Sequence, residues 1–85
     1  MLSNRSNVEA QQPGLLRRLD AAKFCGISPS SWDRLTASGG NPKPIRIRGV
    51  LVWNVRELVA WQDAHCPDRE TWSAMWEVIV KKGKQ

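Results

Sequence analysis

Residues 24–31, FCGISPSS, decide the fold of this chain. Gly26 suits the end of a helix, because glycine readily adopts the left-handed conformation that follows the last helical turn. Ser28 suits the start of the next helix, because its hydroxyl can accept an unpaired backbone N–H. Pro29 suits the first helical position, where no N–H is needed. Two helices are therefore predicted around a turn of about three residues, which is the spacing of a helix-turn-helix.

The residues on either side extend this pattern. The first helix is predicted over residues 19–25, after a short extended lead-in at residues 15–18. The second is predicted over residues 29–38, with Trp32 and Leu35 on its inward face and Gly39-Gly40 at its end.

A β-hairpin is predicted next. Residues 45–48, IRIR, alternate apolar and basic, which indicates a strand with both isoleucines on one face and both arginines on the other. Gly49-Val50 is predicted to form the turn. Leu51 and Trp53 then return on the inward face, which places Val50 and Val52 outward.

Two more helices complete the prediction. Asn54 caps a helix that runs to about His65, and Asp68 caps another of about 14 residues. The inward stripe of the first contains Val55, Leu58, Val59, Trp61 and Gln62. The apolar stripe of the second contains Trp72, Met75, Trp76, Ile79 and Val80.

Length and charge limit the classes of function. At 85 residues the chain holds one domain, and its net charge of +5 favours a polyanionic partner. No apolar run is long enough to cross a membrane, and the polar residues 1–14 predict a disordered tail without a signal peptide. We expect a cytoplasmic protein with a domain over residues 15–66 and a C-terminal helix with a basic tail over residues 67–85.

The ordered set of these motifs resembles a known group of proteins. The matching pieces are Ala21-Ala22 with Gly26-Ile27-Ser28, Trp32-Asp33-Arg34-Leu35, Pro42-Lys43-Pro44-Ile45-Arg46-Ile47, and Trp53 followed by Leu58 and Trp61. Over residues 15–62 the chain resembles the AlpA-like prophage regulators and the phage excisionase-like proteins, which share the MerR-type winged helix-turn-helix. The expected fold is thus mostly helical with a small hairpin, plus a C-terminal helix.

The resemblance implies a double-stranded DNA partner and association with the nucleoid. It implies a small transcriptional regulator or a recombination directionality factor, with the second helix in the major groove and the hairpin as a wing on the neighbouring backbone or minor groove. Arg34 is the candidate for reading a guanine edge, whereas Asp33 beside it would repel phosphate. The candidate DNA-binding residues are Ser30, Ser31, Arg34, Lys43, Arg46, Arg48, Lys23 and Arg18.

Several alternatives stay open at this point. Trp32, Trp53 and Trp61 fit the core better than base-stacking platforms. The stripe of the last helix either completes the core, which we favour, or forms an interface with another copy or a recombinase. The candidate interface residues are Trp72, Met75, Trp76 and Ile79. A protein–protein adaptor that uses this stripe is therefore the second functional hypothesis.

Chemistry at a metal or a nucleophile is not expected. Cys25, His65 and Cys66 lack the paired spacing of a zinc site. With a single histidine and no glycine-rich phosphate loop, no catalytic constellation remains. We expect a protein that is not an enzyme and has no cofactor, no metal site and no small-molecule substrate.

Overall fold

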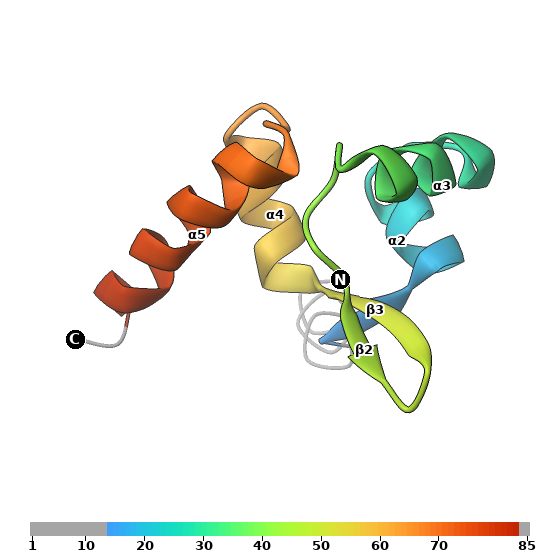
Figure 1. Ribbon diagram of the computed structural model, residues 1–85, viewed down its shortest axis with the longest axis horizontal. Coiled ribbons are helices and arrows are strands. Elements are labelled where there is room, and N and C mark those ends of the chain that lie inside the picture. The colour runs from blue at the N-terminus through green and yellow to red at the C-terminus, as the bar shows by residue number, and fades with distance from the viewer. Residues whose placement is uncertain (1–13, 84–85) are drawn as a thin grey trace, which may run out of the picture.

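The computed structural model describes residues 14–83, which form four helices and one three-stranded antiparallel sheet (Figure 1). The elements are β1 (Leu15–Arg17), α2 (Arg18–Phe24), α3 (Pro29–Ser38), β2 (Ile45–Ile47), β3 (Val50–Asn54), α4 (Val55–Asp63) and α5 (Arg69–Gly83). The tail predicted for residues 1–14 lies, except for Gly14, outside the described residues, as do Lys84 and Gln85. The carbonyl of Gly14 accepts the backbone N–H of Val55 at 2.9 Å, so Gly14 is part of the folded chain.

The turn between α2 and α3 has the predicted chemistry. Gly26 is left-handed, with φ 71°, and the N–H of Ile27 donates back to the carbonyl of Ala22 at 2.9 Å. The hydroxyl of Ser28 accepts the N–H of Ser31 at 3.2 Å, and Pro29 is the first residue of α3. The prediction of a helix over residues 29–38 is confirmed. Helix α2 begins and ends one residue earlier than predicted.

The sheet has one strand more than the predicted hairpin. Strand β1, expected only as an extended lead-in, pairs with β3, so the strand order is β1-β3-β2 and β3 is central. The fold is therefore a mixed arrangement of helices and sheet, with a larger β component than the mostly helical one expected.

The turn of the hairpin is one residue earlier than predicted. Arg48 and Gly49 both have positive φ, 50° and 81°, which is the geometry of a type I′ turn, and Ile47 pairs with Val50. Arg48 therefore lies in the turn rather than on the strand beside Arg46. The placement of the turn at Gly49-Val50 is wrong.

The observed register shows which side chains of β2 share a face with the core residues of β3. Residues that pair directly across strands share a face of the sheet, so Arg46 lies on the same face as Leu51. Ile45 and Ile47 lie on the opposite face and are 42% and 46% exposed. The predicted outward position of Val52 is also wrong, because this side chain is buried in the central strand.

Three tryptophans form the centre of the core, as predicted. The Trp32 ring on α3 meets Trp53 on β3 at a centroid distance of 5.2 Å and Trp61 on α4 at 6.2 Å, both edge to face. The indole N–H of Trp53 donates to the carbonyl of Pro42 at 2.8 Å, and that of Trp61 donates to the carbonyl of Pro67 at 2.9 Å. The same three rings thus fix two loops as well as three elements.

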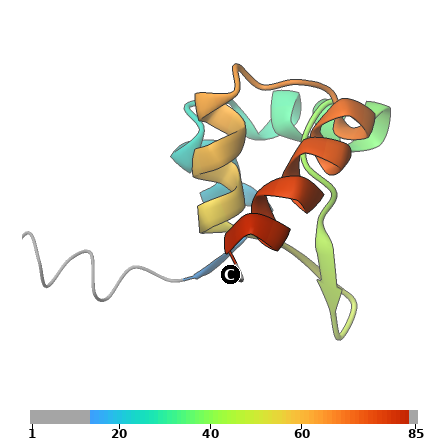
Figure 2. The ribbon, with the colours of Figure 1, turned by 90° about the vertical axis from the view of Figure 1, so that its left-hand side faces the viewer.

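Helices α4 and α5 are capped as predicted. The side-chain oxygen of Asn54 accepts the N–H groups of Arg56 and Glu57, and that of Asp68 accepts the N–H of Thr71. Helix α4 ends at Asp63, and Val59, which was expected on its inward stripe, is 44% exposed. The C-terminal part of helix α5 extends away from α3 and the hairpin (Figure 1 and Figure 2), whereas its first residue donates its backbone N–H to the carbonyl of Gly39 at 2.8 Å.

Arg69 joins the start of α5 to the end of α3. Its guanidinium donates to the carbonyl of Asn41 at 3.1 Å, to the side-chain oxygen of Asn41 at 3.1 Å and to the carbonyl of Thr36 at 3.0 Å. Asn41 is fully buried, and its amide donates to the Thr36 hydroxyl at 2.9 Å. Because no buried side-chain polar atom of this cluster lacks a partner within residues 14–83, the cluster holds α5 to the domain at little desolvation cost.

The last helix completes the core through Trp72, with Trp76 packed against it. Trp72 is fully buried, donates its indole N–H to a Glu57 carboxylate oxygen at 2.9 Å, and stacks on Trp76 at 5.7 Å. Met75 and Ile79, in contrast, are 39% and 43% exposed. No helix within residues 14–83 is both long enough and apolar enough to cross a membrane.

We expect Trp72→Ala to destabilise the fold by about 3–5 kcal/mol, because it removes a buried aromatic ring and leaves Glu57 without its donor. Met75→Ala on the same helix should change stability by no more than about 0.5 kcal/mol. Urea unfolding followed by tryptophan fluorescence measures both. Equal losses for the two variants would contradict this division of α5 into a core side and an exposed side.

Candidate nucleic-acid interface

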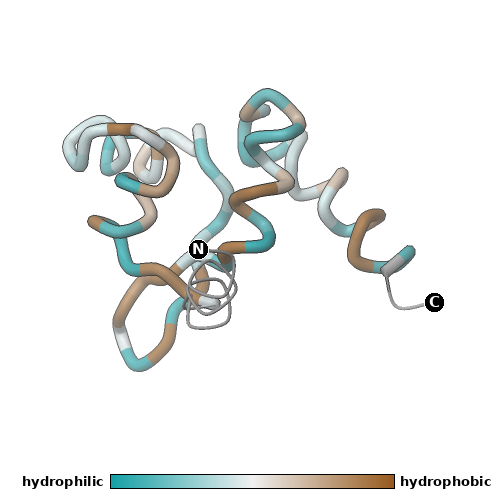
Figure 3. The backbone as a smooth tube through the Cα atoms, turned by 180° about the vertical axis from the view of Figure 1, so that it is seen from behind, coloured by the Kyte–Doolittle hydropathy of each residue, from teal (hydrophilic) through white to brown (hydrophobic). Residues whose placement is uncertain are grey.

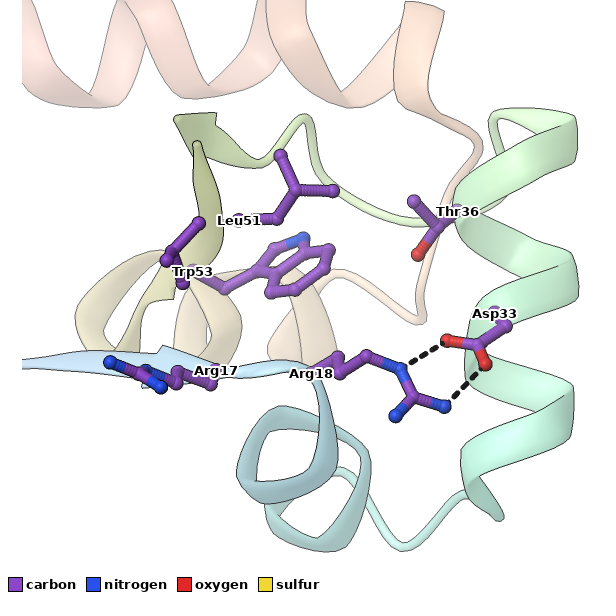
Figure 4. A pocket seen from close by; sticks show the side chains of 7 residues that line it. Arg17, Arg18, Asp33, Thr36, Leu51 and Trp53 are labelled. Carbon is purple, nitrogen blue, oxygen red and sulfur yellow. Dashed lines mark hydrogen bonds and ion pairs between the residues drawn. The ribbon is translucent and has the colours of Figure 1, made fainter. Parts of the chain in front are cut away.

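A hollow of about 300 Å³ opens between α3 and the sheet. It is lined by Arg17, Arg18, Asp33, Thr36, Val50, Leu51 and Trp53 (Figure 4). Two of these side chains are basic and one is acidic. Trp53 also belongs to the core, so the hollow borders the core directly. The hollow therefore lies between α3 and the hairpin and is bordered by two arginines, Arg17 and Arg18.

Arg18 and Asp33 form an ion pair across this hollow. The Arg18 Nε donates to one Asp33 oxygen at 2.9 Å and the Nη2 donates to the other, so the contact is bidentate. Both side chains are about half exposed, 50% and 49%. Hydrogen bonding from Arg18 lowers the pKa of Asp33, and the same bond and charge raise the pKa of Arg18. Asp33 thus carries no unpaired charge, contrary to the repulsion expected from it.

The outer face of α3 is free of the core. Ser30, Ser31 and Arg34 are all exposed, whereas Trp32 is the buried residue of this helix. The Ser30 hydroxyl lies 3.5 Å from that of Ser28, and the Ser31 side chain has no role in the cap. Arg34 forms no salt bridge within residues 14–83, so its guanidinium is available to a ligand.

The two hairpin arginines take different positions. Arg46 lies on the sheet face that carries Leu51, which is the face turned to the hollow. Arg48 lies at the tip of the hairpin, in a left-handed conformation that costs an ordinary side chain roughly 1–2 kcal/mol. Both are exposed. Arg34 thus lies on α3, and Arg46 and Arg48 lie on the β2–β3 hairpin. Both elements are on the side of the molecule opposite the C-terminal end of α5 (Figure 1).

The other two predicted basic contacts lie elsewhere. Lys43 borders a second hollow of about 510 Å³ between α4 and α5, beside Glu57 and Trp76, and is absent from the lining of the first. Its place follows from Pro42, whose carbonyl is held by Trp53. Lys23 is exposed in the last turn of α2. Lys43 therefore borders a different hollow from Arg17 and Arg18.

The candidate interface residues of α5 divide into two sets. Trp72 is buried within the chain and Trp76 is half-buried against it, so these two belong to the core. Met75 and Ile79 remain exposed, and Val78 between them is 54% exposed. The hydrophobic turns near the C-terminal end of α5 stand clear of the sheet and α3 (Figure 3).

Sequence reasoning missed the pairing partners of Arg18 and Arg69. Asp33 is 15 residues from Arg18, and Asn41 is 28 residues from Arg69. No local spacing signals either contact. The one available clue was the presence of an acid on an otherwise basic face, which favours a nearby cation to neutralise it.

The cysteines do not assemble a metal site. No group of three histidine, cysteine or acidic side chains within the described residues is placed to hold a metal ion. Burial raises the pKa of Cys25 to about 11, even though Gln62 donates a hydrogen bond to its sulfur. Cys25 is therefore protonated at neutral pH and packs as a small apolar side chain against the core.

Comparison of the chain with protein-family models, curated proteins and solved structures yields no match.

Proposed function

We propose that this protein binds double-stranded DNA through a winged helix-turn-helix of the AlpA-like and excisionase-like kind. Helix α3 enters the major groove, and the β2–β3 hairpin acts as the wing. One observation carries the proposal: α3 and the β2–β3 hairpin both line the same hollow, which Arg17 and Arg18 border, and the arginines Arg34, Arg46 and Arg48 are exposed on these two elements.

The surface of α3 suits a groove of DNA. The major groove of B-form DNA is about 12 Å wide and admits one α-helix. Ser30, Arg34 and Ala37, spaced by four and three residues, point away from buried Trp32. Short side chains on either side of Arg34 let the helix approach the base edges, and the arginine fork can then reach guanine O6 and N7.

In this proposal the hairpin supplies the electrostatic contacts with DNA. Arg46 and Arg48 are exposed and make no ion pair within residues 14–83. Arginines in such positions bind phosphates or a narrow minor groove. The strained backbone at Arg48 supports this role, since glycine or asparagine would satisfy the turn better.

Two biological roles fit this proposal, a transcriptional regulator and a recombination directionality factor. Selection of bound sites from random duplex DNA distinguishes them. Closely spaced direct repeats would indicate head-to-tail assembly of the kind expected for a directionality factor, and an inverted repeat would indicate a two-fold dimer. Absence of any enriched site would argue against sequence-specific DNA binding.

We expect Arg48→Asn and Arg46→Gln each to weaken DNA binding and to reduce the slope of log K against log salt by about 1, because each removes one phosphate contact. Asparagine tolerates the left-handed conformation of Arg48, so the turn is retained. Fluorescence anisotropy over a salt series measures the slope. The control is Arg56→Gln, because Arg56 is exposed on α4 and does not line the hollow. This variant should leave the salt slope unchanged. An unchanged slope in both hairpin variants would contradict the wing.

Self-association through α5 is the second candidate function, and the exposed stripe of Met75, Val78 and Ile79 favours it. We propose a second copy of this chain as the partner, with the two α5 helices antiparallel. Glu70 lies in the first turn of α5, and Lys81 and Lys82 lie in the last turn. Antiparallel pairing sets the acidic end of one helix against the basic end of the other, whereas parallel pairing sets lysines against lysines.

We expect Val78→Glu to abolish self-association in sedimentation equilibrium, and Val59→Glu, an exposed change on α4, to leave it intact. Glu70→Lys should weaken the dimer several-fold, and Glu70→Lys combined with Lys82→Glu should restore it, because the two charges exchange positions across the interface. A wild-type protein that stays monomeric at millimolar concentration would disprove this candidate.

A further inference from the structure

The ion pair between Arg18 and Asp33 leaves one edge of the guanidinium unused. Asp33 is bound through Nε and Nη2, which is the side of the guanidinium (Figure 4). A guanidinium carries five N–H donors in a fixed planar fork. The Nη1 donors and the second Nη2 donor therefore remain, and they form the end-on pair of the fork. Arg18 makes no other hydrogen bond within residues 14–83.

We infer that the end-on fork of Arg18 reads a guanine edge in the major groove and that Asp33 is the positioning residue that holds it there. This inference rests on the DNA-binding function proposed above and deepens it. Arg18 then specifies a base pair in addition to any read by Arg34, rather than contacting the phosphate backbone as expected from the sequence.

The location of the pair favours a base over a phosphate. Asp33 lies one residue before Arg34 on α3, and its side chain is half exposed at the rim of the hollow. Since the carboxylate belongs to the helix that enters the groove, it holds the Arg18 fork beside that helix, at the depth of the base edges. Guanine offers O6 and N7 as two acceptors at the spacing of an arginine fork.

The rigidity of the pair supports the same assignment. A free arginine loses side-chain entropy when it binds, and a side chain already held in its bound position loses less. A phosphate contact gains little from such positioning, because phosphate oxygens accept from many directions. Arg17, next to Arg18 and also at the hollow, forms no salt bridge within residues 14–83 and is the natural comparison.

Asp33 has two effects at the proposed interface, one on affinity for DNA and one on discrimination between bases. Hydrogen bonding from Arg18 lowers its pKa, so the carboxylate stays ionised and keeps its hold on Arg18 in neutral and mildly acidic solution. Removing it takes away one negative charge from the surface, which raises affinity for any duplex. The same change frees Arg18 to move, which lowers discrimination between bases.

The test begins with the wild-type protein and needs no variant. The preferred duplex is obtained by selection from random DNA, and each guanine in it is replaced in turn by 7-deazaguanine, which lacks the N7 acceptor but still pairs with cytosine. Fluorescence anisotropy gives the affinity of each duplex. We expect at least two sensitive positions, one for Arg34 and one for Arg18. A guanine contacted through both acceptors should show a loss of about 5- to 150-fold when replaced by another base.

Variants then assign the second position. Arg18→Lys keeps the charge but lacks the fork, so discrimination at that position should fall at least fivefold while the salt slope stays the same. Asp33→Ala should lower discrimination at the same position and raise affinity for unrelated duplexes. Arg17→Ala is the matched control and should weaken all duplexes alike. Because Arg18 and Asp33 are half exposed, we expect the variants to fold, and thermal unfolding by circular dichroism checks this.

The two possible failures are distinguishable. If the wild-type protein binds no duplex, the proposed function fails and this inference fails with it. If it binds DNA but the Arg18 and Asp33 variants change affinity equally for all duplexes, Arg18 contacts phosphate and only this inference is overturned. The inference is also overturned if only one guanine is sensitive and that sensitivity is lost in Arg34→Ala but kept in Arg18→Lys.

Discussion

The packing of the Trp32 ring against two other tryptophans holds the surrounding helices and the sheet in place. This ring touches Trp53 on the central strand and Trp61 on α4, so one side chain of α3 sets its distance from both. Its indole N–H has no hydrogen-bond partner within the described residues, which costs about 1–3 kcal/mol. The aromatic contacts and the burial of a whole indole ring outweigh that cost, and they hold α3 at a fixed position above the sheet.

The elements that could be predicted from the sequence are those whose signals are local. Gly26, Ser28 and Pro29 act on backbone groups within a few residues, and helix α3 has the predicted bounds. The turn of the hairpin was misplaced because Gly49 is compatible with either central position of a two-residue turn. Only the pairing of Ile47 with Val50 decides between them. That shift of one residue moves Arg48 from the end of a strand into the turn, while Leu51 and Trp53 keep their predicted inward positions.

The candidate site was predicted in part, for a related reason. The exposure of Ser30, Arg34 and Arg46 follows from helical and strand periodicity, which the sequence contains. The pairing of Arg18 with Asp33 and the displacement of Lys43 to another hollow depend on how distant segments pack. The third strand was missed for the same reason, because residues 15–17 are strand only through their pairing with β3. Contacts between distant residues leave no periodic trace in the sequence.

Helix α3 gives one fully buried side chain to the core and leaves most of its other positions on the surface. This division separates the requirements of folding from those of recognition. Exchanges at Ser30, Ser31, Arg34 and Ala37 alter the surface offered to a ligand without disturbing the packing around Trp32. Single substitutions on this face are therefore expected to be nearly neutral for stability, because the aromatic centre stays unchanged.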